Sequence, residues 1–292
     1  MLSGARRLPL RPSQRLARRA LHPWRVLLAV LALVSAVAAH AQPAGHCFAV
    51  SEAGGCASGR VTDAQGILLP GTHVYFAGPT RRYAHGVLGD DVEWGRLVYV
   101  QQGSAAHGPY LFMEIFLPPS RVFEDLTPRL YDLDGDGQFE IVVVESEASS
   151  GAQLSVYGLR DLRLVQLAAT PHIGRANRWL APLGAADLDG DGAVEIAYID
   201  RPHLAKTLRI WRYADGGLEP VAQAPGLSNH RIGWDYITGG IRDCGAGPEI
   251  VTASGDWQRL MAARLLDGQI ALRDLGRYSP EAEAAALDCA PE

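Results

Sequence analysis

A short aspartate-rich motif that leads into a run of strand-forming residues occurs twice in this chain, and it limits the fold more than any other feature. The first copy is YDLDGDGQFEIVVVES, residues 131–146, and the second is ADLDGDGAVEIAYID, residues 186–200. The aspartates that open the two motifs, Asp132 and Asp187, are 55 residues apart. Self-similarity at such a period indicates that one supersecondary unit is built more than once.

Weaker copies and further strand-like segments extend the repeat on both sides. Residues 241–254 and 88–100 resemble the motif but lack most of its aspartates. Short segments rich in β-branched and aromatic residues follow the motifs, which is typical of strands. These segments are residues 109–116, 152–159, 162–169, 206–213 and 218–224. After the N-terminal leader, helical periodicity is confined to residues 280–287.

Four short antiparallel strands in each unit, repeated about every 50 residues, predict an all-β fold, namely a β-propeller of four to five four-stranded blades. One unit alone could not bury its apolar faces, whereas blades packed around an axis bury them and leave only short edges. We expect a single domain over residues 42–292, with clear repeats at about 72–275. A β-sandwich is the alternative, but it does not explain the 55-residue repeat.

The two strong motifs place carboxylates at loop positions 1, 3, 5 and 9. Calcium prefers six to eight hard oxygen ligands, and four carboxylates held together without a cation would repel one another. The loops therefore predict two calcium sites. The predicted ligands are Asp132, Asp134, Asp136, Glu140 and the carbonyl of Gln138 in the first loop, and Asp187, Asp189, Asp191, Glu195 and the carbonyl of Ala193 in the second. A glycine-rich turn without metal is the alternative.

An EF-hand begins with the same pattern but requires a glutamate at position 12 and a helix after the loop. Position 12 is Val143 in the first loop and Tyr198 in the second, and strand-like residues follow both. These residues exclude an EF-hand.

The pattern D-x-D-G-D-G-x-x-E-I, followed by an apolar strand, resembles the FG-GAP or VCBS-type repeat of integrin α-chains and of secreted bacterial proteins. The resemblance implies a calcium-bearing propeller in which the loop joins the first and second strands of a blade. It also implies that the metal braces this turn rather than catalysing a reaction. Counting the weak copies, it covers roughly residues 72–275.

The N-terminus has the three parts of an export signal. Residues 1–25 carry seven arginines and no acidic residue, residues 26–39 are apolar, and Ala39, His40 and Ala41 form an A-x-A cleavage site. We expect cleavage after residue 41 and a periplasmic or extracellular protein without a remaining membrane span. An uncleaved membrane anchor is the alternative, although the apolar stretch is short for one.

Removing the leader changes the charge of the protein. Of 27 basic residues, seven lie in the leader, so 20 remain against 32 acidic residues, a net charge of about −12. Such an acidic chain argues against nucleic acid and anionic membranes as partners.

The four cysteines, Cys47, Cys56, Cys244 and Cys289, all follow the leader. An even number in an exported chain indicates two disulfides, and the absence of a C-x-x-C pair argues against zinc. We predict Cys47–Cys56, which closes a short loop, and Cys244–Cys289, which ties the C-terminal tail to the third, degenerate loop.

The resemblance places the segments between blades on the face opposite the metal loops, and here they are rich in Arg, His, Asn and Trp. These side chains could hold a carboxylate, a phosphate or a sugar, or they could join neighbouring blades through hydrogen bonds. The candidate ligand-binding residues are His85, Arg129, Arg175, Asn177, Trp179, His230 and Arg231.

We interpret the chain as a binding or scaffold module for a glycan, a small anionic ligand or a protein partner. The rival is a secreted carbohydrate-active enzyme, similar to a polysaccharide lyase, with Tyr83, His85 and Arg129 as its acid, base and carboxylate clamp. None of the common nucleophile, phosphate-loop or zinc-protease motifs occurs, so no catalytic residue is assigned.

Overall fold

The computed structural model describes residues 48–50, 55–57, 71–102 and 110–290, and over these residues the fold is all-β, with a single α-helix. The proposed leader and Cys47 lie outside them, so cleavage of the leader remains a prediction. Strands β1 (Phe48–Val50) and β2 (Gly55–Ala57) form a separate two-stranded sheet.

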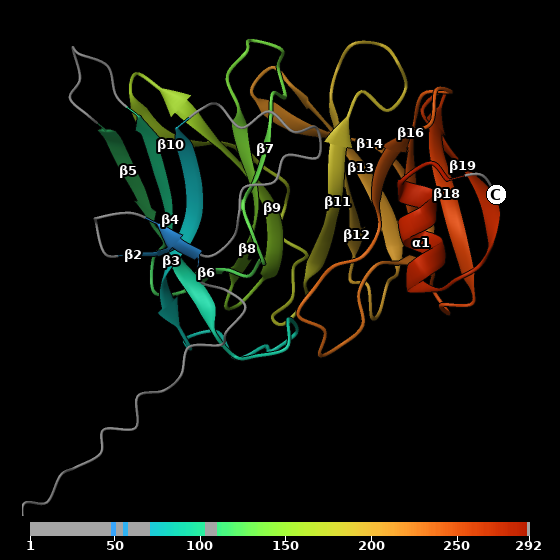
Figure 1. Ribbon diagram of the computed structural model, residues 1–292. Helices are drawn as coiled ribbons and strands as arrows, with labels where there is room; N and C mark the ends of the chain where they lie inside the picture. The colour runs from blue at the N-terminus through green and yellow to red at the C-terminus, as the bar shows by residue number, and fades with distance from the viewer. Residues whose placement is uncertain (1–47, 51–54, 58–70, 103–109, 291–292) are drawn as a thin grey trace, which may run out of the picture. The chain divides into compact units, whose positions relative to one another are not determined.

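The sheet of β11 to β14 shows the repeating unit in its simplest form (Figure 1). Its strands are β11 (Leu180–Ala186), β12 (Glu195–Asp200), β13 (Thr207–Ala214) and β14 (Gly217–Pro225). They pair antiparallel in chain order. Side chains of β11 and β12 are buried throughout, those of β13 alternate between buried and half-buried, and those of β14 are half-buried or exposed with one exception. The inner strands are therefore covered on both faces, as happens when sheets pack face to face.

Two further units repeat this strand order, one on each side of that sheet in the sequence. The first comprises β7 (Arg129–Tyr131), β8 (Glu140–Glu147), β9 (Gly151–Arg160) and β10 (Arg163–Ala169). The second comprises β16 (Gly240–Asp243), β17 (Pro248–Ser254), β18 (Arg259–Leu266) and β19 (Gln269–Arg277). A two-residue strand, β15 (Leu227–Ser228), also pairs with β17. In all three units the loop of the sequence repeat joins the first strand to the second.

The N-terminal strands are continuous with the sheet of β7 to β10. Strands β3 (Thr72–Thr80), β4 (Glu93–Gln102) and β5 (Tyr110–Phe116) pair antiparallel. Strand β6 (Arg121–Phe123) pairs with both β4 and β8, which creates one eight-stranded sheet.

Apolar side chains of neighbouring sheets pack against one another and form the core. One cluster joins Leu208 of β13 to Ile250 of β17 and Leu265 of β18, each at most 1% exposed. A second joins Val142 of β8 to Ile196 of β12. Each fully buried side chain of this kind stabilises the fold by about 1.5–3 kcal/mol, so contacts between sheets hold the units together.

The helix α1 (Pro280–Leu287) follows the last strand and coincides with the segment for which the sequence predicts helical periodicity. The hydroxyl of Ser279 caps it by accepting a hydrogen bond from the amide of Ala282 at 3.1 Å, and Pro280 occupies the first turn, where no amide donor is needed. Within the described part of the chain, no helix is long and apolar enough to cross a bilayer.

The structure confirms the all-β prediction, and the strand-like segments of the sequence lie in β5, β9, β10, β13 and β14. Closure of the sheets into a propeller, and the number of blades, remain proposals.

Candidate metal loops and ligand pocket

The first loop, residues 132–139 between β7 and β8, gathers three carboxylates. Oxygens of Asp132, Asp134 and Asp136 lie within 4.8 Å of one another. Gly135 and Gly137 have φ of +74° and +83°, so the chain can turn back sharply beneath these side chains. Backbone amides hold the carboxylates in place: Gly137 donates to Asp132 at 3.1 Å, and Asp136 donates to Asp134 at 3.3 Å.

One oxygen of the first loop lacks a partner. Asp132 Oδ1 is buried, and among the described residues nothing donates a hydrogen bond to it. An unpaired buried acceptor costs about 1–3 kcal/mol, more when it is charged. A hard cation bound between Asp132, Asp134 and Asp136 would remove this cost, so the donor set fits calcium.

Glu140 and Gln138, which the sequence predicts as further ligands, have contacts within the loop. Glu140 Oε2 accepts a hydrogen bond from the amide of Leu133 at 2.9 Å and so braces the loop backbone. Burial, with smaller contributions from the nearby aspartates, raises the pKa of Glu140 to about 7 against that hydrogen bond. The side-chain amide of Gln138 donates to Asp136 at 3.1 Å.

The second loop, residues 187–194 between β11 and β12, has the same backbone plan but a different charge balance. Its close carboxylate group is Asp187, Asp189 and Glu195. Both oxygens of Asp187 accept hydrogen bonds, from Gly190 at 2.7 Å and Gly192 at 3.0 Å. Glu195 accepts from the amide of Leu188 at 2.8 Å, as Glu140 does from Leu133. No buried carboxylate oxygen of the described second loop is left without a partner.

A guanidinium already lies among the carboxylates of the second loop. Arg212, on β13, is 3.0 Å from Asp189, 2.8 Å from Asp191 and 2.6 Å from Glu195. Burial raises the pKa of Glu195, and the Arg212 cation counteracts that rise. The amide of Ala193 donates to Asp191 at 2.9 Å. The second loop therefore has an internal cation, whereas the first loop has one longer and more exposed ion pair, between Arg160 and Asp134 at 3.8 Å.

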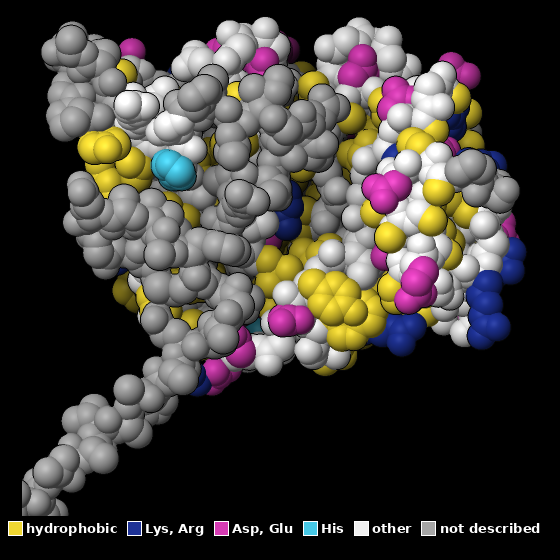
Figure 2. All heavy atoms as spheres, in the orientation of Figure 1, with side chains coloured by type: hydrophobic (Ala, Val, Ile, Leu, Met, Phe, Trp, Pro, Cys, Tyr) yellow, Lys and Arg dark blue, Asp and Glu magenta, His cyan; other side chains and the backbone are white. Residues whose placement is uncertain are grey.

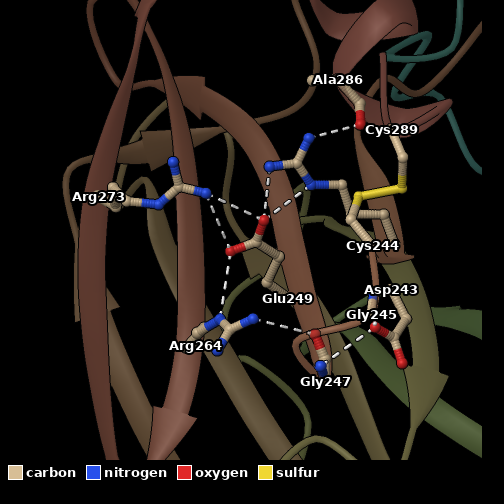
Figure 3. Close-up of a disulfide and its surroundings, with 10 residues drawn as sticks. Asp243, Cys244, Gly245, Gly247, Glu249, Arg264, Arg273, Ala286 and Cys289 are labelled. Atoms are coloured by element: carbon tan, nitrogen blue, oxygen red, sulfur yellow. Dashed lines mark hydrogen bonds and ion pairs between the residues drawn. A yellow bond between two sulfur atoms is a disulfide. The ribbon is translucent and has the colours of Figure 1, made fainter. Parts of the chain in front are cut away.

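The third loop, residues 244–247 between β16 and β17, has lost the aspartate series and keeps an arginine cluster (Figure 3). Glu249 pairs with Arg242 at 2.5 Å, Arg264 at 3.3 Å and Arg273 at 3.2 Å. Burial alone would raise the pKa of Glu249, but the hydrogen bonds and charges of these arginines hold it below its ordinary value.

A disulfide joins Cys244 of the third loop to Cys289 after helix α1, as Figure 3 shows. The predicted Cys244–Cys289 pairing is thus confirmed. The guanidinium of Arg242 also donates to the carbonyl of Ala286 in the helix at 2.6 Å. The predicted Cys47–Cys56 pairing lies outside the residues whose side chains the structure describes.

Strand register explains the difference between the three loops. Glu195 stands opposite Arg212 in the pairing of β12 with β13. In the pairing of β17 with β18, Ile250 stands opposite Ala263, so the residue before Ile250, Glu249, stands opposite Arg264. In the pairing of β8 with β9, Ile141 stands opposite Tyr157, so the residue before Ile141, Glu140, stands opposite Gly158. A Cβ on Gly158 would lie 3.6 Å from Glu140 Oε1, which shows that this position faces the loop glutamate.

Three of the seven candidate ligand residues line one small pocket of about 40 Å³: His85, Asn177 and Trp179. The other lining residues are Arg178, Arg201, Pro202, His203 and Leu204. Sequence reasoning missed residues 201–204 because they join β12 to β13 within one sheet, whereas it considered only connections between units. The DRPH sequence at 200–203, polar and adjacent to an apolar strand, was an available signal.

A buried acid orients His85 in this pocket. The Nδ1 of His85 is hydrogen-bonded to Glu124, which also accepts from the hydroxyl of Ser146. Glu124 has no exposed surface, and burial raises its pKa although His85 and Ser146 lower it. The indole of Trp179 donates to the Glu124 carbonyl at 2.8 Å and is only 2% exposed. Trp179 thus fixes the wall of the pocket and has little ring surface to offer a sugar.

Two histidines, one lining the pocket and one buried beside it, have lowered pKa values. His203 Nε2 lies 2.9 Å from Nδ1 of His230, whose other ring nitrogen lies 3.1 Å from the carbonyl of Trp234. Burial lowers the pKa of His203 to about 4, with a further contribution from His230, and burial also lowers the pKa of His230. His230 has no exposed surface, so His203 is the member of this pair that lines the pocket.

The remaining candidate residues have other contacts. Arg129 forms a two-bond ion pair with buried Asp125, at 2.8 and 3.1 Å, so it is not free to clamp a carboxylate. Arg175 is exposed and does not line the described pocket. Arg231 stacks on Trp234 and Trp257, with its guanidinium carbon 5.4 and 4.5 Å from the ring centroids.

The catalytic set of the rival hypothesis is only partly assembled. The hydroxyl of Tyr83 accepts a hydrogen bond from the amide of Asn177 at 3.2 Å, and the ring is 4% exposed. Arg129 is paired with Asp125, and of Tyr83, His85 and Arg129, His85 is the residue that lines the described pocket.

Comparisons with known proteins bear on residues 132–198. This segment matches the FG-GAP-like repeat family. It begins at the first aspartate loop, contains β8 to β11 and the second loop, and ends in β12. No curated protein matches the chain. The family match agrees with the spacing of the two aspartate loops, and the chain is therefore a protein that carries an FG-GAP-like repeat.

Proposed function

We propose that residues 42–292 form a calcium-braced β-propeller that is exported and acts as a binding or scaffold module. The observation that carries the calcium proposal is Asp132 Oδ1, a buried acceptor without a donor, beside the carboxylates of Asp134 and Asp136. Calcium would bind more tightly in the first loop than in the second, where Arg212 competes for Asp189, Asp191 and Glu195.

The propeller proposal is supported by the three units of identical strand order. Burial falls from the inner strands to the outer one in the sheet of β11 to β14, as expected of a blade with neighbours on both faces. The two aspartate loops and the degenerate third loop lie at the same connection in their units, so all three belong on one rim of the proposed propeller.

Export is supported by the leader pattern together with the Cys244–Cys289 disulfide. Disulfides persist mainly in oxidising compartments such as the periplasm and the extracellular space.

Calcium binding is tested with the protein of residues 42–292 by elemental analysis and thermal unfolding. After dialysis against buffer with a low concentration of calcium, the protein should still contain bound calcium. Its melting temperature should rise with added calcium and fall with chelator, because an ion that binds only the folded state stabilises it by mass action, about 2.7 kcal/mol at 100 times Kd. Absence of metal, with a melting temperature indifferent to chelator, would refute the proposal.

For the binding role we propose a small anionic group at the pocket of His85 and Asn177. Arg178 and Arg201 line it, although Arg201 shares its charge with Asp200 through bonds of 2.7 and 2.9 Å. A pocket of about 40 Å³ admits only the end of a ligand, such as a carboxylate, sulfate or phosphate group on a glycan or protein. Arg178→Ala should weaken binding in an array of acidic glycans and organic acids, with the calcium-dependent melt unchanged. Equal binding by both proteins would exclude this pocket.

One observation favours the rival, a carbohydrate-active enzyme: the imidazole of His85 is oriented by Glu124, as a general base requires. An unsaturated product from acidic polysaccharides, lost in His85→Ala, would establish catalysis. If acidic polysaccharides bind but yield no product, the binding module is favoured.

A further inference from the structure

A cavity of about 290 Å³ lies between helix α1 and the connection from β15 to β16. It is separate from the metal loops and shares no residue with the pocket of His85. Its lining residues are Tyr236, Ile237, Thr238, Gly239, Tyr278, Pro280, Glu283, Ala284 and Leu287. Most of the wall is aromatic or aliphatic, and it includes one carboxylate.

That carboxylate, Glu283, is 6% exposed and is incompletely paired. Its Oε1 is buried and accepts no hydrogen bond from any described residue, although Thr238 and Gly239 are close. Its Oε2 accepts one long hydrogen bond, 3.4 Å, from the hydroxyl of Tyr278. Burial raises the pKa of Glu283, and the neighbouring donors of Thr238, Tyr278 and Gly239 lower it in part, but no described arginine, lysine or histidine contributes to the shift. A buried carboxylate without a counter-ion is costly, so the cavity has an unmet need for a cationic donor.

The aromatic residues around Glu283 form a surface suited to a cation. Tyr236 is 47% exposed and stacks on Trp234, with ring centroids 4.5 Å apart and planes 14° apart. Tyr278 packs edge-on against Trp257 at 5.1 Å. Figure 2 shows hydrophobic side chains gathered below helix α1, over the β15–β16 connection, with acidic side chains on the helix beside them. Arg231 already stacks its cation on Trp234 and Trp257, so these rings accept a positive charge.

We propose that this cavity binds a primary ammonium group on a short aliphatic chain. The ammonium would donate to Glu283 Oε1 and lie against the rings of Tyr236 and Tyr278, while the chain would contact apolar residues such as Leu287. A neutral hydroxyl could donate the hydrogen bond but would leave the carboxylate charge uncompensated. A quaternary ammonium would compensate the charge but has no N–H to donate. The single lysine of the chain, Lys206, already donates to the carbonyl of Gly255 at 2.5 Å.

The probe is n-butylammonium chloride, titrated into the protein of residues 42–292. n-Butanol is the isosteric neutral control, and tetramethylammonium is the control that carries the charge without an N–H. Tryptophan fluorescence is the readout, because Trp234 stacks on Tyr236 and Trp257 contacts Tyr278. We expect saturable binding of n-butylammonium and weaker responses to both controls. An equal response to n-butanol, or no saturable response to n-butylammonium, would overturn the proposal.

Glu283→Gln keeps the size of the side chain and removes the charge, so it should weaken n-butylammonium binding by about tenfold or more. Glu281→Gln is the matched control, because Glu281 lies in the same helical turn but is exposed and lines no part of the cavity. If Glu283→Gln does not fold, Tyr236→Leu is the second variant, because Tyr236 is 47% exposed and its replacement should not prevent folding. Tyr236→Leu should weaken n-butylammonium binding. Full binding by that variant would overturn the proposal.

The source of the ammonium group is distinguished by two further probes, butane-1,4-diammonium and a blocked tripeptide with lysine at its centre. Binding of the peptide as tightly as n-butylammonium points to a lysine side chain of a partner protein. Binding of the diammonium ion without the peptide points to a free amine. Failure of both probes would contradict the proposed chemistry.

Discussion

The first and second aspartate loops share a sequence pattern and a backbone, yet they solve the same electrostatic problem differently. In the loop of residues 132–139, Asp132 retains a buried oxygen without a donor. In the loop of residues 187–194, every buried oxygen is paired, and Arg212 lies among the acids. The motif fixes where the carboxylates are, whereas the residue opposite the loop glutamate on the third strand decides how their charge is balanced.

The third loop continues this trend. Its glutamate, Glu249, is surrounded by Arg242, Arg264 and Arg273, and a disulfide replaces the aspartates as the brace of the turn. Across the three units, stabilisation of the turn therefore changes from a proposed metal ion to an arginine and then to arginines with a covalent bond. Four predictions test this comparison, from the largest expected effect to the smallest.

Removing the disulfide with Cys244→Ser and Cys289→Ser should lower the free energy of unfolding by about 4 kcal/mol, as the chain-entropy model gives for cysteines 45 residues apart. Urea unfolding in calcium and in chelator measures it. Because the third loop lacks the aspartate series, the loss should be equal in both conditions. A loss that appears only in chelator would mean that the loops are not independent.

Asp132→Asn should abolish most of the stabilisation by calcium, about 3 kcal/mol at saturating metal. Asn keeps the acceptor for the Gly137 amide but removes the charge that a cation needs. The matched change in the second loop, Asp187→Asn, should cost less of the calcium effect because Arg212 already balances that loop. Thermal unfolding in a calcium series decides between them. Equal effects would break the comparison.

Arg212→Ala should lower stability by about 2 kcal/mol in chelator, because the charged hydrogen bonds to Asp189 and to buried Glu195 are lost together. Calcium should then restore more stability than it adds to the unchanged protein, since the loop acids no longer have a competitor. Arg259→Ala, which removes an exposed pair with Asp274, is the control and should respond to neither condition. A calcium response identical to that of the unchanged protein would show that Arg212 does not compete.

Gly158→Arg, combined with Leu167→Ala to make room, should make the first loop resemble the second. A Cβ at Gly158 would lie 2.6 Å from the side chain of Leu167, which is why both changes are needed. The difference in stability between calcium and chelator should shrink by about 1 kcal/mol relative to Leu167→Ala alone. If that difference is unchanged, charge at this strand position does not control the loop.

Much of the fold was predictable because it depends on local pattern. Short segments rich in β-branched and aromatic residues, bounded by Gly, Pro, Asp or Ser, predicted β9, β10, β13 and β14, and the helical periodicity of residues 280–287 predicted α1. The Cys244–Cys289 pair followed from the loss of aspartates in the third loop, where another brace was needed. The strands and the helix are each encoded within a few neighbouring residues, whereas the disulfide joins cysteines 45 residues apart.

What could not be predicted depends on register between strands. Nothing in the motif at 187–195 shows that Arg212 faces it, since a shift of one residue would turn that side chain to the other side of the sheet. The pocket of His85 likewise takes Arg201 and His203 from a connection within a sheet. The sequence also does not show that Arg129 is paired. Its partner, Asp125, lies in the same loop segment, and only the structure shows that this aspartate is buried against Arg129.

The position on the third strand of each unit that stands opposite the loop glutamate also has a genetic consequence. Glycine and arginine codons can differ by a single base, and this position holds Gly158 in one unit, Arg212 in the next and Arg264 in the last. A point mutation there, together with room for the new side chain where Leu167 lies close to Gly158, would replace the proposed metal ion with a counter-charge that the protein itself carries. Duplicated units of this kind can thus be adapted, one at a time, to surroundings where the supply of divalent ions is unreliable.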